Sequence, residues 1–262
     1  MKAVLKYPGA KNRLANWIVD HIPEHKVYCE PFFGSGAVFF NKKICYNEIL
    51  NDLDDEVYNF FKVLRNNGEQ LIDAIALTPY SRTEYMNCYT AKSHCDDIEK
   101  ARIFAVKCWQ GFGCGNVYKN GFRRGIGEKS PNPAKGWNML PATLEKAIER
   151  LKNAQIENKD ALELIESLNG KQTFIYIDPP YLLETRKKYL YEYEMADDEH
   201  IKLLEMIKEK RCKIMISGYE NELYETYLKG WRKTKKKTHA ECSVSRTETL
   251  WMNYDFERQL TI

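Results

Sequence analysis

Thr173-Phe174-Ile175-Tyr176-Ile177-Asp178-Pro179-Pro180-Tyr181 is the stretch that decides the fold. Its first five residues form a short apolar run rich in β-branched and aromatic side chains, which predicts a fully buried strand. Two consecutive prolines remove two backbone donors and fix φ, so the chain after Asp178 cannot continue a sheet ladder. The strand therefore ends in a carboxylate, free carbonyl groups and an aromatic ring.

Such an ending can accept hydrogen bonds from an amino group and stack on a flat ring. Open α/β sheets bind ligands at the carboxyl edge of their strands, where this group would lie. The alternative is a proline-capped strand with a tyrosine on the surface, because short motifs occur by chance. Other stretches of the chain have to decide between the two.

The composition predicts a folded protein with a sizeable core. With 262 residues, 44% of them hydrophobic, the chain forms one large domain or a domain with an insertion. The net charge is only +3, so nucleic-acid binding has to depend on where the charge lies. Eight cysteines without a Cys-x-x-Cys pair, and no signal peptide or membrane span, predict buried thiols in a reducing cytoplasm.

One pattern suggests a metal site and fails on inspection. His21-Ile22-Pro23-Glu24-His25 matches a zinc peptidase motif whose ligands must share one helical face. A proline at its centre would break that helix, so we interpret the stretch as a solvated turn and expect no metal.

A strand followed by a glycine loop lies near the N-terminus. Val27 to Glu30 reads as the strand, the loop runs from Pro31 to Gly36, and Ala37 to Phe40 is predicted to begin a helix. Phe39 replaces the third glycine of a dinucleotide fingerprint, and no Gly-Lys-Ser/Thr follows for a triphosphate. Glu30 can instead hold a cationic amino group, which suits S-adenosylmethionine.

Two neighbouring segments complete this half. Tyr7 and Lys11 flank a basic Pro-Gly turn before a helix predicted from Leu14 to about His21, and they could cover an adenine ring and reach a carboxylate. Asp52 ends the second strand, sixteen residues beyond Gly36, where a carboxylate takes ribose hydroxyls in βαβ units. The acids from Asp52 onward also suit the N-terminus of a helix, so one can cap while another binds.

The alternation of strands and helices stops between residues 67 and 153, which predicts an insertion between a first part, 1–66, and a second, 154–262. We expect helices over 82–92, 96–110 and 141–151. Between the last two, Asn120-Gly121 flanked by aromatic residues predicts the turn of a β-hairpin over 116–127. Its basic residues can be solvated surface charges, or can reach DNA bases and phosphates.

After the insertion the alternation resumes. We expect strands over 155–158, 213–217 and 247–254, a helix over 161–168, and a helix capped by Asp197. Asp160 then faces the same edge of the sheet as Asp52 and Asp178. The run from Lys229 to Lys237 carries six basic residues and no acid, which predicts a solvated face or a contact with a phosphate backbone.

Taken together, these motifs resemble the Dam-type (D12 class) DNA adenine-N6 methyltransferases. Nearly the whole chain takes part in the resemblance, and the motifs stand in that family's order. They are Tyr7-Pro8-Gly9-Ala10-Lys11, Glu30-Pro31-Phe32-Phe33-Gly34-Ser35-Gly36, Asn51-Asp52, Asp178-Pro179-Pro180-Tyr181 and Glu248-Thr249-Leu250-Trp251.

The resemblance implies an α/β fold: the Rossmann-like, mostly parallel mixed sheet of S-adenosylmethionine-dependent methyltransferases, with an inserted helical and hairpin subdomain that recognises DNA. It implies a cytoplasmic enzyme acting on double-stranded DNA without a metal, as a monomer, with a cognate restriction endonuclease as a partner in some systems. Implied cofactor-binding residues are Tyr7, Lys11, Glu30, Phe33, Gly34, Ser35, Gly36, Asp52, Asp160 and Asp178. Implied catalytic residues are Asp178, Pro179, Pro180 and Tyr181, and implied DNA-binding residues are Asn116, Tyr118, Lys119, Arg123, Arg124, Lys188, Lys235 and Lys236.

The expected reaction is methyl transfer to a flipped adenine. A carboxylate and a backbone carbonyl that accept the two amino hydrogens favour the pyramidal form of the nitrogen, and Asp178 with the Pro179 carbonyl can do this. Alternatives are methyl transfer to cytosine, RNA or a protein amide, and a catalytically silent DNA-binding module. The DNA sequence that is read stays open, because the hairpin does not match known members residue for residue.

Overall fold

The computed structural model describes residues 1–90, 95–113, 118–128, 130–186, 189–239 and 245–255. Its main sheet has the strand order β5-β2-β1-β6-β7-β9-β8. The first five strands in this order are parallel, whereas β9 runs antiparallel to β7 and β8. The predicted mostly parallel α/β sheet is confirmed. The bounds are β1 Val27–Glu30, β2 Asn47–Asn51, β5 Ala154–Glu157, β6 Thr173–Ile177, β7 Lys213–Gly218, β8 Arg232–His239 and β9 Ser245–Met252.

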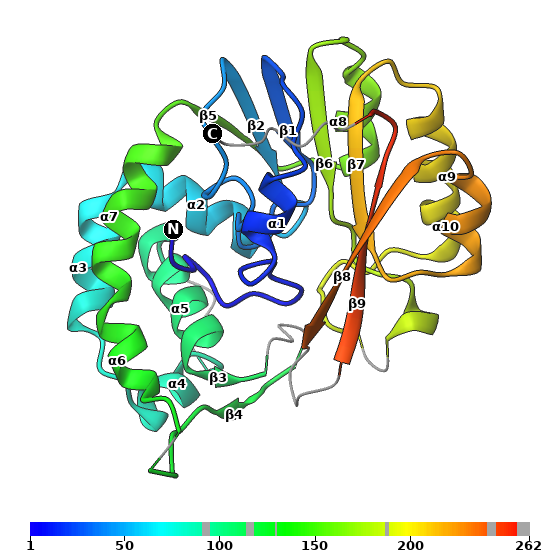
Figure 1. Ribbon diagram of the computed structural model, residues 1–262. Coiled ribbons are helices and arrows are strands. Elements are labelled where there is room, and N and C mark those ends of the chain that lie inside the picture. The colour runs from blue at the N-terminus through cyan, green and yellow to red at the C-terminus, as the bar shows by residue number, and fades with distance from the viewer. Residues whose placement is uncertain (91–94, 114–117, 129, 187–188, 240–244, 256–262) are drawn as a thin grey trace, which may run out of the picture.

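Helices cover both faces of the sheet (Figure 1). The bounds are α1 Ala15–Val19, α2 Asp55–Asn66, α3 Gly68–Leu77, α4 Arg82–Asn87, α5 Asp97–Gln110, α6 Pro133–Asn138, α7 Leu140–Leu151, α8 Ala161–Ser167, α9 Asp197–Lys208 and α10 Glu222–Tyr227. No helix in the described ranges is long and apolar enough to span a bilayer.

The central strand β6 is buried along its whole length, as predicted. Because side chains alternate along a strand, Phe174 and Tyr176 join the core under α2, α5 and α7, whereas Ile175 and Ile177 join the core under α8, α9 and α10. The chain runs from β1 to β2 and β5 on one side of the sheet, and from β6 to β7 on the other. Strand order therefore reverses between β1 and β6, the place where open α/β sheets bind ligands.

The segment between α2 and β5 consists of helices and a small hairpin, β3 Gly111–Phe112 with β4 Gly121–Phe122. Its buried side chains, such as Trp137 and Leu144, belong to the same core cluster as one face of the sheet. The insertion is thus packed firmly on the sheet. Its division from the catalytic part at residues 67 and 153 stays a prediction.

The helix predicted after the glycine loop is wrong. Residues 37–46 make turns, with a single bond from Phe40 N to Gly36 O at 3.0 Å and two from Asn41 N and Lys42 N to Val38 O. Ala37 to Phe40 are also buried on all sides, so this turn has no solvent face.

The predicted hairpin turn at Asn120-Gly121 is also wrong. Gly121 lies within β4, opposite Phe112, so the connection between the strands is 113–120. Tertiary packing decides the register, because the Phe122 ring packs on Tyr80 and Tyr85 at 5.2 and 5.9 Å between centroids.

Three helical predictions need correction. Asp197 is the first residue of α9 rather than its cap, and Glu199 accepts the Ala196 N–H at 2.8 Å. The helix predicted over 82–92 ends at Asn87, and α3 and α6 were not expected.

The basic run at 229–237 contributes to the edge strand β8, most of whose side chains are exposed.

Candidate functional site

A pocket with an open volume of about 970 Å³ lies beside the carboxyl ends of β1 and β6. It has the position of a small-molecule site at a strand-order reversal. Most of the residues implied by the resemblance line it: Tyr7, Lys11, Glu30, Phe33, Gly34, Ser35, Asp52, Asp160, Asp178 and Pro180. Gly36, Pro179 and Tyr181 are not among the residues that line it.

The glycine loop is shaped by two residues in the left-handed region, Gly34 at φ 49° and Gly36 at φ 66°. A Cβ at Gly36 would lie 2.5 Å from the Phe33 ring and 2.8 Å from Phe40, so only glycine fits. Phe33 is buried and packs edge-on against Phe61 at 4.7 Å. The backbone of the loop is thereby held against the pocket.

Asp52 lies where β2 ends and ties the second strand to the glycine loop. Its carboxylate accepts the Gly34 N–H at 2.7 Å and the Asp54 N–H at 3.0 Å. Burial raises the pKa of Asp52 to about 7, although these backbone donors lower it. Asp54 caps α2 by accepting the Glu56 N–H at 2.9 Å, and it lines the pocket together with Asp52. That Asp52 binds the ribose stays a prediction.

Glu30 is an acid enclosed in the pocket wall, with 3% of its surface exposed. The Tyr28 hydroxyl donates to it at 2.7 Å. Burial raises the pKa of Glu30 to about 8, against the lowering effect of the Tyr28 hydrogen bond. A carboxyl group so placed is poised to ionise when a cation enters the pocket.

Beside the carboxyl end of β6, two donors meet on one oxygen of Asp178. Lys11 Nζ lies 2.8 Å from Oδ1, and the Ser217 hydroxyl donates to it at 2.8 Å. The Tyr181 hydroxyl oxygen lies 3.2 Å from the same atom, but its single proton is donated to Glu248. No hydrogen bond from the described residues reaches Oδ2. The carboxylate is therefore held in one orientation with its second oxygen available to a ligand.

Glu248 supports this corner from β9. It accepts the Tyr181 hydroxyl and lies 3.7 Å from Lys11 Nζ, which also sits 4.8 Å above the Tyr181 ring. Burial lowers the pKa of Lys11, but the charges of Asp178 and Glu248 outweigh it and raise that pKa well above its ordinary value. Burial raises the pKa of the Glu248 carboxyl.

The sequence reasoning gave no role in the pocket to Ser217, and it quoted Glu248 only as part of a family motif. Ser217 could have been found, because it lies near the end of the strand beside β6. The motif Glu248-Thr249-Leu250-Trp251 was the signal for Glu248. Tyr191, Tyr193 and Met195 also line the pocket, and nothing in their local pattern predicts this.

These last residues belong to a segment folded over the pocket by an ion pair. Arg186 binds Glu194 with both terminal nitrogens and donates Nε to the Tyr181 carbonyl at 2.6 Å. Glu194 also accepts the backbone N–H groups of Leu190 and Tyr191. The guanidinium of Arg186 is consequently committed to holding this segment, which leaves it poorly suited to reading DNA.

The candidate DNA-binding residues lie on two separate elements, and Asn116 and Lys188 fall outside the described residues. In the hairpin region, Arg123 donates Nε to the Gly111 carbonyl at 2.9 Å, whereas Arg124 is exposed. Tyr118 is 41% exposed, and Lys119 Nζ lies 5.5 Å above the Tyr89 ring.

The two candidate DNA-binding lysines of β8, Lys235 and Lys236, point to opposite faces of the sheet. Lys235 pairs with Glu220 at 2.5 Å, and Lys236 lies 5.7 Å above the Trp17 ring. Figure 1 shows the β3–β4 hairpin and the far ends of β8 and β9 on the same side of the molecule.

Comparisons with known proteins agree with this geometry. A Type II methyltransferase of Methanocaldococcus jannaschii, M.MjaIII, is 28% identical over 97% of this chain and 99% of its own length. M.CviBI of Paramecium bursaria Chlorella virus NC1A, also a Type II methyltransferase, is 25% identical over 87% of this chain and 88% of its own length. A DNA adenine methylase of Vibrio cholerae is 34% identical, but over only 27% of this chain and 25% of its own length.

The model of one protein family matches residues 7–241, a span that includes the glycine loop, the insertion and the Asp178 corner. The chain therefore belongs to the D12 class N6 adenine-specific DNA methyltransferase family.

Proposed function

We propose that this protein transfers a methyl group from S-adenosylmethionine to the exocyclic amino nitrogen of an adenine turned out of duplex DNA, and that the residues above divide this work. The observation that carries the proposal is a single pocket whose wall includes Glu30, Asp52 and the oriented Asp178. Membership of the family supports both the adenine and the methyl donor.

The donor groups of the pocket fit S-adenosylmethionine. Glu30 is a buried acid facing a place for an ammonium group, and Asp52 has lone pairs left for ribose hydroxyls beyond its two backbone bonds. When bound, the cofactor supplies an activated methyl group. Asp160 lines the same pocket while capping α8 at 2.8 Å from Leu162 N, so its proposed place is near the adenine of the cofactor.

Asp178 is proposed to act on the target nitrogen. The lone pair of an adenine amino group is conjugated with the ring, so hydrogen-bond acceptors that favour the pyramidal form make it a better nucleophile. Oδ2 of Asp178 and the Pro179 carbonyl are the proposed acceptors. Lys11 and Ser217 fix the carboxylate through Oδ1, and the enzyme contributes positioning and electrostatics without a covalent intermediate or a metal.

The target atom cannot be reached inside a duplex, so the base has to be extruded at a cost of a few kcal/mol. Tyr181 is proposed to stack on the flipped base and offset part of that cost. Its ring is held for this by the Tyr219 ring at 4.9 Å and by the bond of its hydroxyl to Glu248.

The hairpin region and β8 are proposed to hold the duplex. Arg124, exposed beside the hairpin, is the proposed base-reading arginine, because Arg123 is already bonded to the hairpin backbone. Lys236 is proposed to contact phosphate, and Lys235 less so because of its pairing with Glu220. We further propose a cytoplasmic monomer, with a restriction endonuclease as a partner that the Type II names of its relatives support.

Transfer of a tritiated methyl group to duplex DNA, followed by nucleoside analysis, tests the proposal. The expected product is N6-methyladenine. Label in cytosine, in RNA or in protein, or no label at all, would contradict it.

A further inference from the structure

Residues 37–42 follow the glycine loop, are buried except for the half-buried Asn41, and make turns rather than a helix or strand. A loop that has to keep a precise shape without a regular ladder needs support from side chains. The search for that support leads away from the pocket, to the opposite end of β2.

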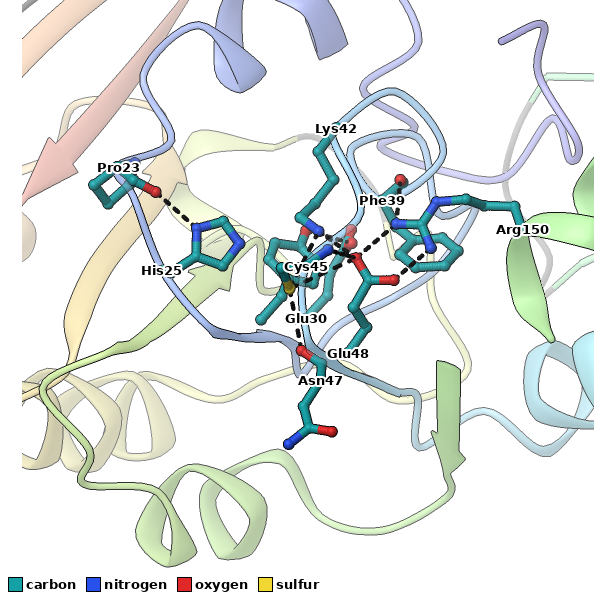
Figure 2. A network of polar contacts seen from close by, with 10 residues as sticks. Pro23, His25, Glu30, Phe39, Lys42, Cys45, Asn47, Glu48 and Arg150 are labelled. Atoms are coloured by element: carbon teal, nitrogen blue, oxygen red, sulfur yellow. Dashed lines mark hydrogen bonds and ion pairs between the residues drawn. The ribbon is translucent and has the colours of Figure 1, made fainter. Parts of the chain in front are cut away.

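Glu48, the second residue of β2, is the centre of this support. Its side chain is 1% exposed. Its carboxylate binds Lys42 Nζ, accepts the Cys45 N–H at 3.4 Å, and takes both terminal nitrogens of Arg150. Figure 2 shows Lys42 and Arg150 converging on this carboxylate. Burial opposes the ionisation of Glu48, but the hydrogen bonds from Arg150 and Lys42 prevail and lower its pKa.

Arg150 comes from α7, the last helix of the insertion, and it also contacts the segment after the glycine loop directly. Its guanidinium lies 3.7 Å from the centre of the Phe39 ring, and one of its nitrogens lies 3.4 Å from the Phe39 carbonyl (Figure 2). Phe39 packs on Phe33 at 5.8 Å, and its backbone amide has a lowering effect on the pKa of Glu30. Phe39 therefore touches Arg150 on one side and the pocket residue Phe33 on the other.

A second link runs through Lys42. Its ammonium lies 4.3 Å above the Tyr28 ring, and the Tyr28 hydroxyl donates to Glu30 at 2.7 Å. Three buried charges thus alternate from Arg150 through Glu48 to Lys42, and Tyr28 links Lys42 to the Glu30 carboxyl. Removing one residue of such a chain disturbs the next, because each buried charge depends on its neighbour for stabilisation in the low-dielectric interior.

We propose that Arg150 is a positioning residue for the cofactor loop: through Phe39 and Glu48 it fixes the loop that binds the methionine end of the cofactor, and so makes cofactor affinity depend on the insertion. The part that concerns the cofactor rests on the proposed function. The part that concerns the conformation of the loop does not.

Arg150→Met tests the proposal, since it removes the charge and the bidentate contact and keeps an unbranched side chain over Phe39. Two controls on the same helix separate positioning from stability. Leu144→Ala opens a cavity in the core and lowers the melting temperature without touching the loop. Lys152→Met removes an exposed lysine whose ion pair with Glu149 lies at the surface. Arg150→Lys, which keeps the charge but loses the planar fork, serves if the methionine variant does not fold.

Calorimetry with S-adenosylmethionine alone, well below every melting temperature, is the first measurement. We expect Arg150→Met to raise Kd by about tenfold and Arg150→Lys by about threefold, with both controls unchanged. Wild-type affinity in the arginine variants, or an equal loss in Leu144→Ala, would overturn the positioning role. Absence of binding to the wild type would instead count against the proposed function.

Hydrogen exchange without any cofactor is the second measurement. The amides of Phe40, Asn41 and Lys42, which bond to the loop backbone, are expected to exchange about tenfold faster in Arg150→Met than in Leu144→Ala. Equal protection of these amides in the two variants would refute the positioning of the loop, whatever the cofactor result.

Discussion

If Glu30 pairs with the ammonium group of S-adenosylmethionine, the affinity for the cofactor should fall as the pH is lowered. Its carboxyl is almost fully enclosed, and burial raises its pKa to about 8. A neutral carboxyl cannot pair with the ammonium, so the apparent Kd scales as one plus the ratio of protonated to ionised Glu30. From about pH 8 to about pH 6 this factor rises from about 2 to about 100, an increase of ~50-fold in Kd.

The expected fall in cofactor affinity above about pH 8 has a different cause. The α-amino group of the ligand loses its proton near pH 8, as such groups do at about 7.7–8.0, so affinity is expected to be greatest close to that pH. Titration calorimetry across this range, in buffers of different ionisation enthalpy, measures both the affinity and the proton released by Glu30. Glu30→Gln should bind more weakly and lose the acid limb. An affinity of the wild type that is flat between about pH 6 and 8 would refute the pairing of Glu30 with the ammonium.

The raised pKa of Glu30 also makes the stability of the folded chain depend on pH. Because the pKa of Glu30 lies higher in the folded chain than its ordinary 4.5, its contribution to stability is full below 4.5 and is lost as the pH rises through about 8.

Asp178→Asn should lower kcat by about 10²–10³-fold while the fold is retained at a lower melting temperature, because the change removes the charge paired with Lys11; stopped-flow or steady-state methylation assays with turnover retained would remove it from catalysis. Asp52→Ala should weaken cofactor binding by about 1–3 kcal/mol with a smaller effect on DNA binding, and calorimetry that finds the affinity unaltered would end its ribose role. Arg124→Ala should relax discrimination at one base pair by about 1–3 kcal/mol, whereas Lys236→Ala should weaken all sequences alike and flatten the salt dependence. Sequencing of methylated sites decides this pair: an unchanged motif at lower yield in the arginine variant would make the hairpin region a phosphate contact only.

Strong local patterns predicted most of the sheet. The apolar run into Asp178, the strand into the glycine loop and the strand that ends at Asp52 all lie within a residue or two of their expected places, because burial on both faces leaves an unambiguous sequence pattern. The failures share a cause. The segment after Gly36 and the hairpin at Gly121 take conformations that depend on distant partners, Arg150 in one case and Tyr80 and Tyr85 in the other.

The site shows the same division. Residues at the ends of strands could be assigned to one edge of the sheet, because parallel strands bring their carboxyl ends together. Glu248 comes from an antiparallel strand at the far end of the chain, and Tyr191 depends on the pairing of Arg186 with Glu194. Neither position follows from spacing, since each is set by a contact between segments whose relative placement only the folded chain defines.

The edge strand β8 has a consequence for self-association. Its eight residues include five lysines and arginines, and its outer edge has no partner strand in the described sheet. Two copies meeting there would bring rows of like charge face to face, which is unfavourable across paired strands. An otherwise open sheet is thereby protected against extension into fibres or strand-swapped dimers, while the same charges stay exposed to a polyanion such as DNA.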